Sequence, residues 1–217
     1  MARRIGQREE VRHWLPSQGI DPAPLAELNS ECLGLLASRA AQEQGVGPVD
    51  LPPLLSALRE TWADLPAQAV RRLSAAPFSL FDAGFASSPR WLELRSSGVH
   101  DQTRAAPAFF EPAAARSITR RMLVYGWHLA RSRPRAACLV FGATLPAVES
   151  LAACSLAALD AAADRNGHAL RPRWSHQPAF WRELLSAASA GADQRLHELL
   201  LGGVQRLAAE TLAAHSL

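Results

Sequence analysis

Lysine is absent from this chain of 217 residues, and isoleucine and valine are scarce, with 3 Ile and 9 Val. β-Branched residues favour strands, and buried parallel strands read as runs of Val and Ile. This shortage excludes an all-β fold and argues against a doubly wound α/β sheet. The helix formers Ala and Leu supply 42 and 32 positions. We therefore predict an all-α protein, a multi-helix bundle of about 8–10 helices with short irregular connecting segments.

The basic residues are 23 arginines, and the net charge is only +3. A GC-rich genome gives this arginine usage without selection on the protein. Selection for guanidinium groups, which bind phosphate or carboxylate through two hydrogen bonds, would also give it. The sequence does not separate the two explanations, and we prefer the first. A net charge of this size is too small for coating nucleic acid or a membrane through charge alone, although a local basic patch is compatible with it.

Cysteine is also rare, with Cys32, Cys138 and Cys154 widely spaced. An odd number at these spacings fits neither a disulfide framework nor a zinc site. Each cysteine lies among Leu and Ala at helical spacing, where a free thiol packs as a small apolar group. We expect a protein of the reducing cytoplasm. The first residues lack the apolar core of a secretory signal, and charges interrupt each apolar stretch, so we expect no membrane insertion.

The common catalytic motifs are missing as well: G-x-G-x-x-G, the P-loop, G-x-S-x-G and H-E-x-x-H do not occur. No two of the seven histidines stand three or four residues apart, so a helical metal pair is absent. We therefore expect a non-enzymatic protein and assign no catalytic, metal-binding or cofactor-binding residue. A helical enzyme whose site is assembled from distant residues ranks last among our hypotheses.

Prolines, glycines and changes in apolar periodicity divide the chain into four regions. They are a flexible lead-in at 1–21, an N-terminal helical region at 22–95, a linker or long loop at 96–111, and a C-terminal helical region at 112–217. Whether the two helical regions are separate domains or share one core is open at this stage. Helices are predicted near 22–44, 52–62, 66–75, 112–130, 134–141, 145–153, 155–165, 178–190 and 192–214, with a short one from Trp91. The phenylalanines of 77–85 predict a packing plug, and 170–174 predicts a short extended piece.

Two basic features could position phosphates. They are the group Arg131, Arg133 and Arg135 at a helix break, and the pair Arg171 and Arg173. The alternative for the first is a solvated helix end, where cations complement the helix dipole. The last helix has a broad apolar face that suits internal packing or a partner helix. Its candidate interface residues are Leu196, Leu199, Leu200, Val204 and Leu207.

The three short helices within 134–165 invite comparison with a helix-turn-helix, because tight turns around glycine join them. The third helix, 155–165, would be the recognition helix. It offers Asp160, Asp164 and a terminal Arg165 where Arg, Asn or Gln normally meets base edges. We expect this helix to read DNA poorly.

Residues 121–212 resemble the FlhD family of flagellar transcriptional regulators, which work together with FlhC. The resemblance rests on the apolar helix 122–131, the stretch Ala137-Cys138-Leu139-Val140-Phe141-Gly142, the helix 146–152 and the segment Ser155-Leu156-Ala157-Ala158-Leu159. It implies an all-helical, dimer-forming protein that acts in transcription through a partner. It also implies phosphate contacts by Arg131, Arg133 and Arg135, and packing roles for Cys138, Leu139 and Phe141.

Our leading hypothesis is a cytoplasmic bacterial regulatory protein in transcription control, non-enzymatic and homo-oligomeric, that binds a protein partner. DNA is a possible second ligand of this protein. The alternative is an adaptor or accessory subunit of a secretion or motility apparatus with no role in nucleic-acid binding. Neither hypothesis requires a cofactor.

Overall fold

The computed structural model describes residues 21–42, 51–85 and 107–214, and within them the protein is all-α, as predicted. Two strands of two residues each form the sheet. The elements are α1 (Ala23–Gln42), α2 (Pro53–Ala57), α3 (Arg59–Ala63), α4 (Ala67–Ser74), β1 (Phe81–Asp82), α6 (Pro112–Ser132), α7 (Pro134–Phe141), α8 (Leu145–Ala152), α9 (Leu156–Asn166), the 3-10 turn η2 (Gly167–Ala169), β2 (Arg171–Pro172), α10 (Pro178–Ala190) and α11 (Asp193–Ala213). The predicted lead-in, the helix from Trp91 and most of the predicted linker lie outside the described residues.

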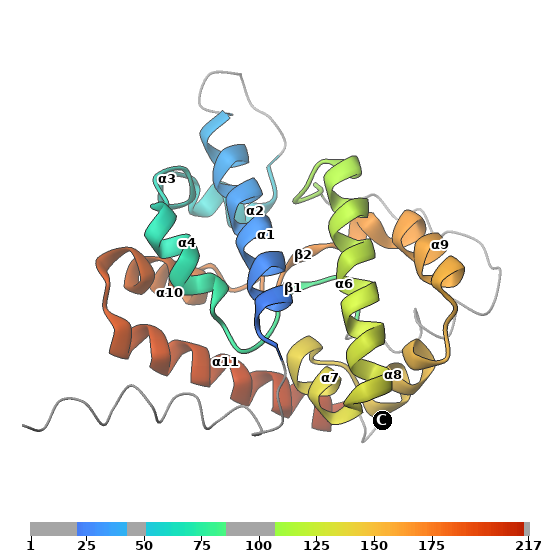
Figure 1. Cartoon of the computed structure of the whole chain (residues 1–217). Helices are drawn as coiled ribbons and strands as arrows, with labels where there is room; N and C mark the ends of the chain where they lie inside the picture. Colours follow the sequence, from blue (N-terminus) through green and yellow to red (C-terminus); the bar gives the residue numbers. More distant parts are fainter. Residues whose placement is uncertain (1–20, 43–50, 86–106, 215–217) are drawn as a thin grey trace, which may run out of the picture.

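Helices α1 and α6 lie side by side at the centre of the molecule (Figure 1). Helices α3 and α4 pack against α1 on one side, and α10 joins them there. Helices α7, α8 and α9 pack against α6 on the other side. Helix α11 runs along the bottom of the view and contacts both α10 and α7, so it connects the two sides (Figure 1).

The two helical regions of the sequence share one hydrophobic core. Strand β1 pairs antiparallel with β2, so that Phe81 lies opposite Pro172. Helix α10, from the C-terminal region, packs on α4 of the N-terminal region. The buried apolar residues of both regions form one contiguous cluster. The described parts of 22–95 and 112–217 are therefore one packing unit.

The segment between α4 and β1 is a packing plug, which confirms the prediction. Phe78, Phe81 and Phe85 are buried to 1–2% exposure. The buried Asn29 of α1 holds this segment: its Nδ2 donates to the carbonyl oxygen of Phe78 at 3.1 Å, and its Oδ1 accepts from the backbone N–H of Leu80 at 2.9 Å. One side chain thus pairs two backbone groups that would otherwise be buried without partners.

Local signals fix the bend between α7 and α8. Pro134 opens α7, and Gly142 ends it at φ +57°, a left-handed conformation that glycine adopts at little cost. Thr144 then caps α8, because its hydroxyl accepts from the backbone N–H of Ala147 at 3.4 Å. The two helices bend by 115°. Within the described ranges, no single helix is long and apolar enough to cross a membrane.

Helix α11 uses its apolar face inside the molecule, which corrects part of the predicted partner interface. Leu196 and Leu207 are 6% and 2% exposed and belong to the core. Leu199, Leu200 and Val204 are half-buried and pack against that core. Apolar periodicity predicts that a helix face is covered, but it does not show whether a partner or the same chain covers it. Here the same chain covers this face of α11.

Candidate functional site

Arg173 does not offer the phosphate contact that the sequence suggested, because it is 5% exposed. Its Nε donates to the carbonyl oxygen of Ser79 at 2.7 Å, and its Nη2 donates to the carbonyl oxygen of Phe141. Its backbone N–H donates to Leu80 at 2.9 Å. The guanidinium therefore connects the segment before β1 and the end of α7 to the segment after β2. Arg171, two residues earlier, is exposed on β2.

Neighbouring groups complete this buried cluster around Arg173. Burial lowers the pKa of Arg173, and the carboxylates of Asp82 and Glu210 oppose that shift by favouring the charged form. The indole N–H of Trp181 donates to the carbonyl oxygen of Arg173 at 2.7 Å. Glu210 of α11 accepts from the indole N–H of Trp174 at 2.8 Å. These contacts give Arg173 a structural role and account for its buried position.

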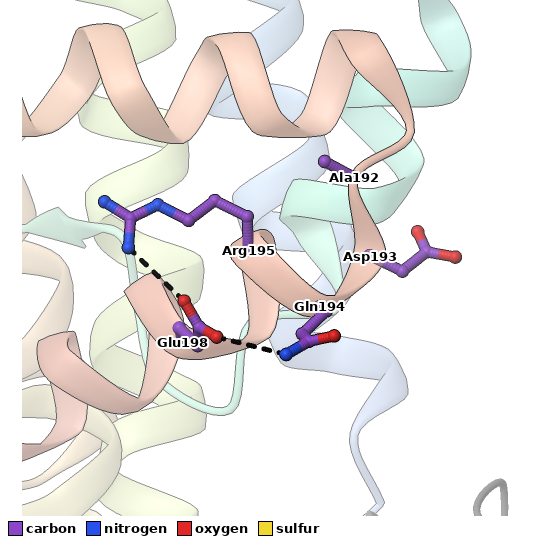
Figure 2. Close-up of a pocket in the computed structure, with 5 residues that line it drawn as sticks. All are labelled: Ala192, Asp193, Gln194, Arg195 and Glu198. Atoms are coloured by element: carbon purple, nitrogen blue, oxygen red, sulfur yellow. Dashed lines mark hydrogen bonds and ion pairs between the residues drawn. The ribbon is translucent and has the colours of Figure 1, made fainter.

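A second polar cluster lies where α10 turns into α11. An open pocket there is lined by residues from the start of α11, all exposed (Figure 2): Ala192, Asp193, Gln194, Arg195 and Glu198. The carboxylate of Asp193 points away from Arg195 and pairs with Arg72 of α4 at 3.4 Å. The pocket therefore lies between side chains that are already engaged in contacts between helices.

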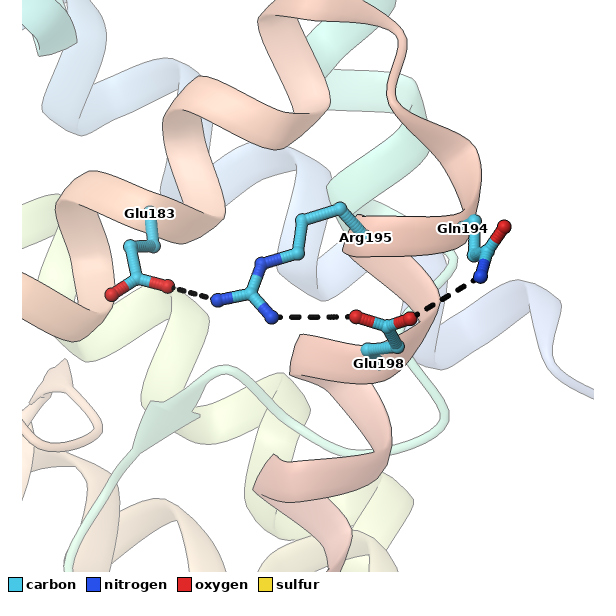
Figure 3. A network of polar contacts seen from close by, with 4 residues as sticks. All are labelled: Glu183, Gln194, Arg195 and Glu198. Atoms are coloured by element: carbon cyan, nitrogen blue, oxygen red, sulfur yellow. Dashed lines mark hydrogen bonds and ion pairs between the residues drawn. The ribbon is translucent and has the colours of Figure 1, made fainter.

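Arg195 is the centre of a chain of contacts across the α10–α11 junction (Figure 3). It donates to Glu183 of α10 and to Glu198 of α11, and Gln194 donates to Glu198 at 3.4 Å. These side-chain hydrogen bonds raise the pKa of Arg195. Each carboxylate in the network has an arginine partner, so the arrangement fastens two helices rather than presenting a free acid or base.

The third cluster has arginines without such partners. Arg131 and Arg135 are exposed, and Arg133 is half-buried at the junction between α6 and α7. Arg131 lies over the ring of Trp127 at 4.7 Å from its centroid. Among the residues that the structure describes, none of the three arginines forms an ion pair with a carboxylate.

Two leucines of α7 and α8 are exposed. Leu139 of α7 is 50% exposed and Leu145, the first residue of α8, is 41% exposed. The expected packing role is therefore wrong for Leu139, which points outward, whereas Phe141 is buried at 1%. The sequence does contain a sign of this exposure. Leu139 follows the charged Arg135 by four residues, and residues four apart share one helix face.

We call Arg131, Arg133, Arg135, Leu139 and Leu145 the α7–α8 surface. Its two helices lie against each other in space as well as in sequence. The charge of Glu149, on α8, helps burial to raise the pKa of the half-buried Cys138 on α7. Glu149 therefore lies near α7, and it is one turn from the exposed Leu145 on α8.

Comparisons with family models, with curated proteins and with solved structures found no match to this chain. Within 21–42, 51–85 and 107–214, no three His, Cys, Asp or Glu side chains are grouped so that they could hold a metal ion. The α7–α8 surface combines exposed leucines with arginines that form no ion pair within the described part of the chain, and we take it as the candidate functional site.

Proposed function

We propose that this protein is non-enzymatic and acts by binding another protein through the α7–α8 surface, as an adaptor or regulatory subunit. The observation that carries the proposal is the exposure of Leu139 one helical turn from Arg135, an arginine that forms no ion pair with a carboxylate in the described residues. Leu145, at the start of α8, is exposed as well. Singly exposed leucines are common on soluble proteins. Leu139 differs because it shares one helix face with Arg135.

The composition of the surface suits a protein partner. Interface centres are enriched in apolar side chains and arginine, and arginine forks recognise carboxylates in two-point contacts. A partner that covers Leu139 and Leu145 would remove their exposed apolar area from water, which stabilises a complex by about 25 cal/mol per Å². The arginines would supply orientation and charge steering.

DNA binding is the second candidate, and one observation favours it. Helices α7 and α8 meet at 115° across the three residues from Gly142 to Thr144, which is the geometry of a helix-turn-helix. The second helix of this pair, however, exposes Leu145, Pro146 and Glu149. None of these side chains is a good reader of base edges, so contact with DNA would rest on Arg131, Arg133 and Arg135 at the phosphates.

The wider context follows from the two hypotheses drawn from the sequence. A cytoplasmic, homo-oligomeric regulator in transcription control and an accessory subunit of a secretion or motility apparatus both work through protein contacts. The structural observations above favour the feature that these two hypotheses share. We therefore propose protein binding as the activity. The identity of the partner will show which cellular process the protein serves.

Site-specific photo-crosslinking in the native cells tests the proposal. A photoreactive amino acid replaces Leu139, and in a control chain it replaces Ser186, an exposed residue of α10. We expect one protein to be crosslinked from position 139, unaffected by nuclease, and not from position 186. Crosslinks from 139 to DNA would replace the proposal with the second candidate. The same products from both positions would refute a specific surface.

A further inference from the structure

We infer that the partner segment at the α7–α8 surface is an acidic amphipathic helix, with carboxylates facing the arginines and apolar residues facing Leu139 and Leu145. This inference rests on the proposed function and adds the chemistry of the partner. It follows from the balance of charge at the α6–α7 junction, from the local excess of arginine and from the spacing of the exposed residues.

Contacts within the chain account for Arg131 but not for Arg133 and Arg135. Arg131 lies in the last turn of α6, where a cation complements the negative end of the helix dipole, and it covers Trp127. Arg133 is the N-cap residue of α7, and Arg135 lies in its first turn. Cations are unfavourable at this positive end of a helix, and no side chain caps it. Carboxylates from outside would complement this end of α7.

Two other arginines of the same region form ion pairs within the chain. Arg120 pairs with Asp160 at 2.7 Å, and Arg121 pairs with Glu31. The sequence from 107 to 190 contains ten arginines against five carboxylates, although the whole chain carries only +3. The surplus of positive charge is therefore local, and the α6–α7 junction exposes part of it. Complementary charge on a partner steers association and selects against basic partners.

The spacing of the exposed groups suits a helix. Arg135 and Leu139 are one turn apart on the outward side of α7, and Leu145 is exposed at the start of the next helix, α8. An amphipathic helix presents a carboxylate and a leucine one turn apart in the same way. Glu149 lies at the α8 side and repels carboxylates. The acidic end of the partner helix should therefore face the α6–α7 junction.

Fluorescence anisotropy with designed peptides tests this chemistry on the full-length protein. The probe is a helix-forming peptide of about 18 residues that carries leucines along one face, with glutamates one turn away from them at one end of that same face. Two control peptides carry lysine in place of glutamate or serine in place of leucine. A protein with Arg131→Gln, Arg133→Gln and Arg135→Gln is compared with one in which three exposed arginines elsewhere, Arg71, Arg165 and Arg182, become glutamine.

We expect only the acidic leucine peptide to bind, more weakly as salt rises. The triple variant at the junction should lose about tenfold in affinity, which corresponds to about 1.4 kcal/mol, and the control triple variant should lose little. Equal binding of the lysine peptide, or no effect of the junction variant, would overturn the inference. Arginine-dependent binding of a DNA duplex in preference to every peptide would also overturn it. Protein crosslinks from position 139 would still stand in that case, so the failure of the inference is distinct from failure of the proposed function.

Discussion

The Nε of Arg173 donates a hydrogen bond of 2.7 Å to the carbonyl oxygen of Ser79, which lies 94 residues earlier in the chain. The same guanidinium also donates to Phe141 at the end of α7. A single buried side chain thus connects the segment between α4 and β1 with the end of α7, the helix that carries part of the candidate site. The α7–α8 surface depends on this connection for its position.

Replacement of Arg173 should destabilise the whole protein. Arg173→Met keeps much of the side-chain volume but leaves the carbonyl oxygens of Ser79 and Phe141 without these donors. We expect a loss of about 3 kcal/mol in the free energy of unfolding, because buried polar groups lose their partners. Urea denaturation followed by circular dichroism measures this change, and Arg171→Met, at an exposed position of β2, is the matched control. Equal stability of the two variants would contradict the structural role of Arg173.

The helix boundaries of the C-terminal region could be predicted because their signals are local. Proline opens α7, glycine in the left-handed conformation ends it, and the hydroxyls of Thr144 and Ser155 cap α8 and α9. Each signal acts within one turn of the chain, so no knowledge of the fold is needed. The prediction of an all-α fold is confirmed for the same reason, since helix propensity is a property of short windows.

What could not be predicted depends on long-range packing. Arg171 and Arg173 look alike in the sequence, yet one is exposed and the other is buried, because the carbonyl partners of Arg173 come from distant segments. The predicted helix from Pro52 to Trp62 is broken at Leu58 into α2 and α3, without a proline or glycine there to mark the break. In the candidate site, the arginines were found from their clustering. The exposure of Leu139 was missed because apolar residues in helices are usually core.

Two adjacent glycines of α11 provide a matched test of its packing. A Cβ added at Gly203 would lie 2.5 Å from Cζ of the buried Phe78, whereas one added at Gly202 would meet nothing within 4 Å. Gly203→Ala should therefore cost about 1–3 kcal/mol through overpacking. Gly202→Ala should stabilise by up to about 1 kcal/mol, because alanine is the better helix former.

Thermal unfolding of the two alanine variants measures the difference directly. Since both positions are in the same helix, propensity affects them alike, and only the contact with Phe78 separates them. Unfolding temperatures that rise equally in both variants would show that α11 does not pack on Phe78 as described.

Arg135 should act against stability while serving binding. Its place in the first turn of α7 is unfavourable for a cation, so Arg135→Glu should raise the free energy of unfolding by about 0.5 kcal/mol. The same change should abolish binding of the acidic leucine peptide, because it places a like charge at the contact. Chemical denaturation and anisotropy on one preparation measure both effects. A variant that loses both stability and binding would indicate that Arg135 has a structural role instead.

The absence of lysine makes the alkaline stability of this protein a test of Cys32. Between about pH 8.5 and 11, the side chains that titrate are the three cysteines and the single tyrosine, Tyr125. Burial is the main reason that the pKa of Cys32 is raised well above its usual range. The unfolded chain releases this thiol proton above about pH 8.5 while the folded chain retains it, so stability is full below that pH and falls above it. We expect a decline that approaches about 1.4 kcal/mol per pH unit from Cys32 alone.

Cys32→Ala should show a shallower decline than the parent protein in urea denaturation at a series of pH values, whatever its stability at neutral pH. Burial raises the pKa of Tyr125 as well, and this contribution remains in both proteins, so the difference between the two slopes isolates Cys32. Identical slopes would mean that the thiol ionises as freely in the folded protein as in the unfolded one, and that Cys32 is not buried in the core.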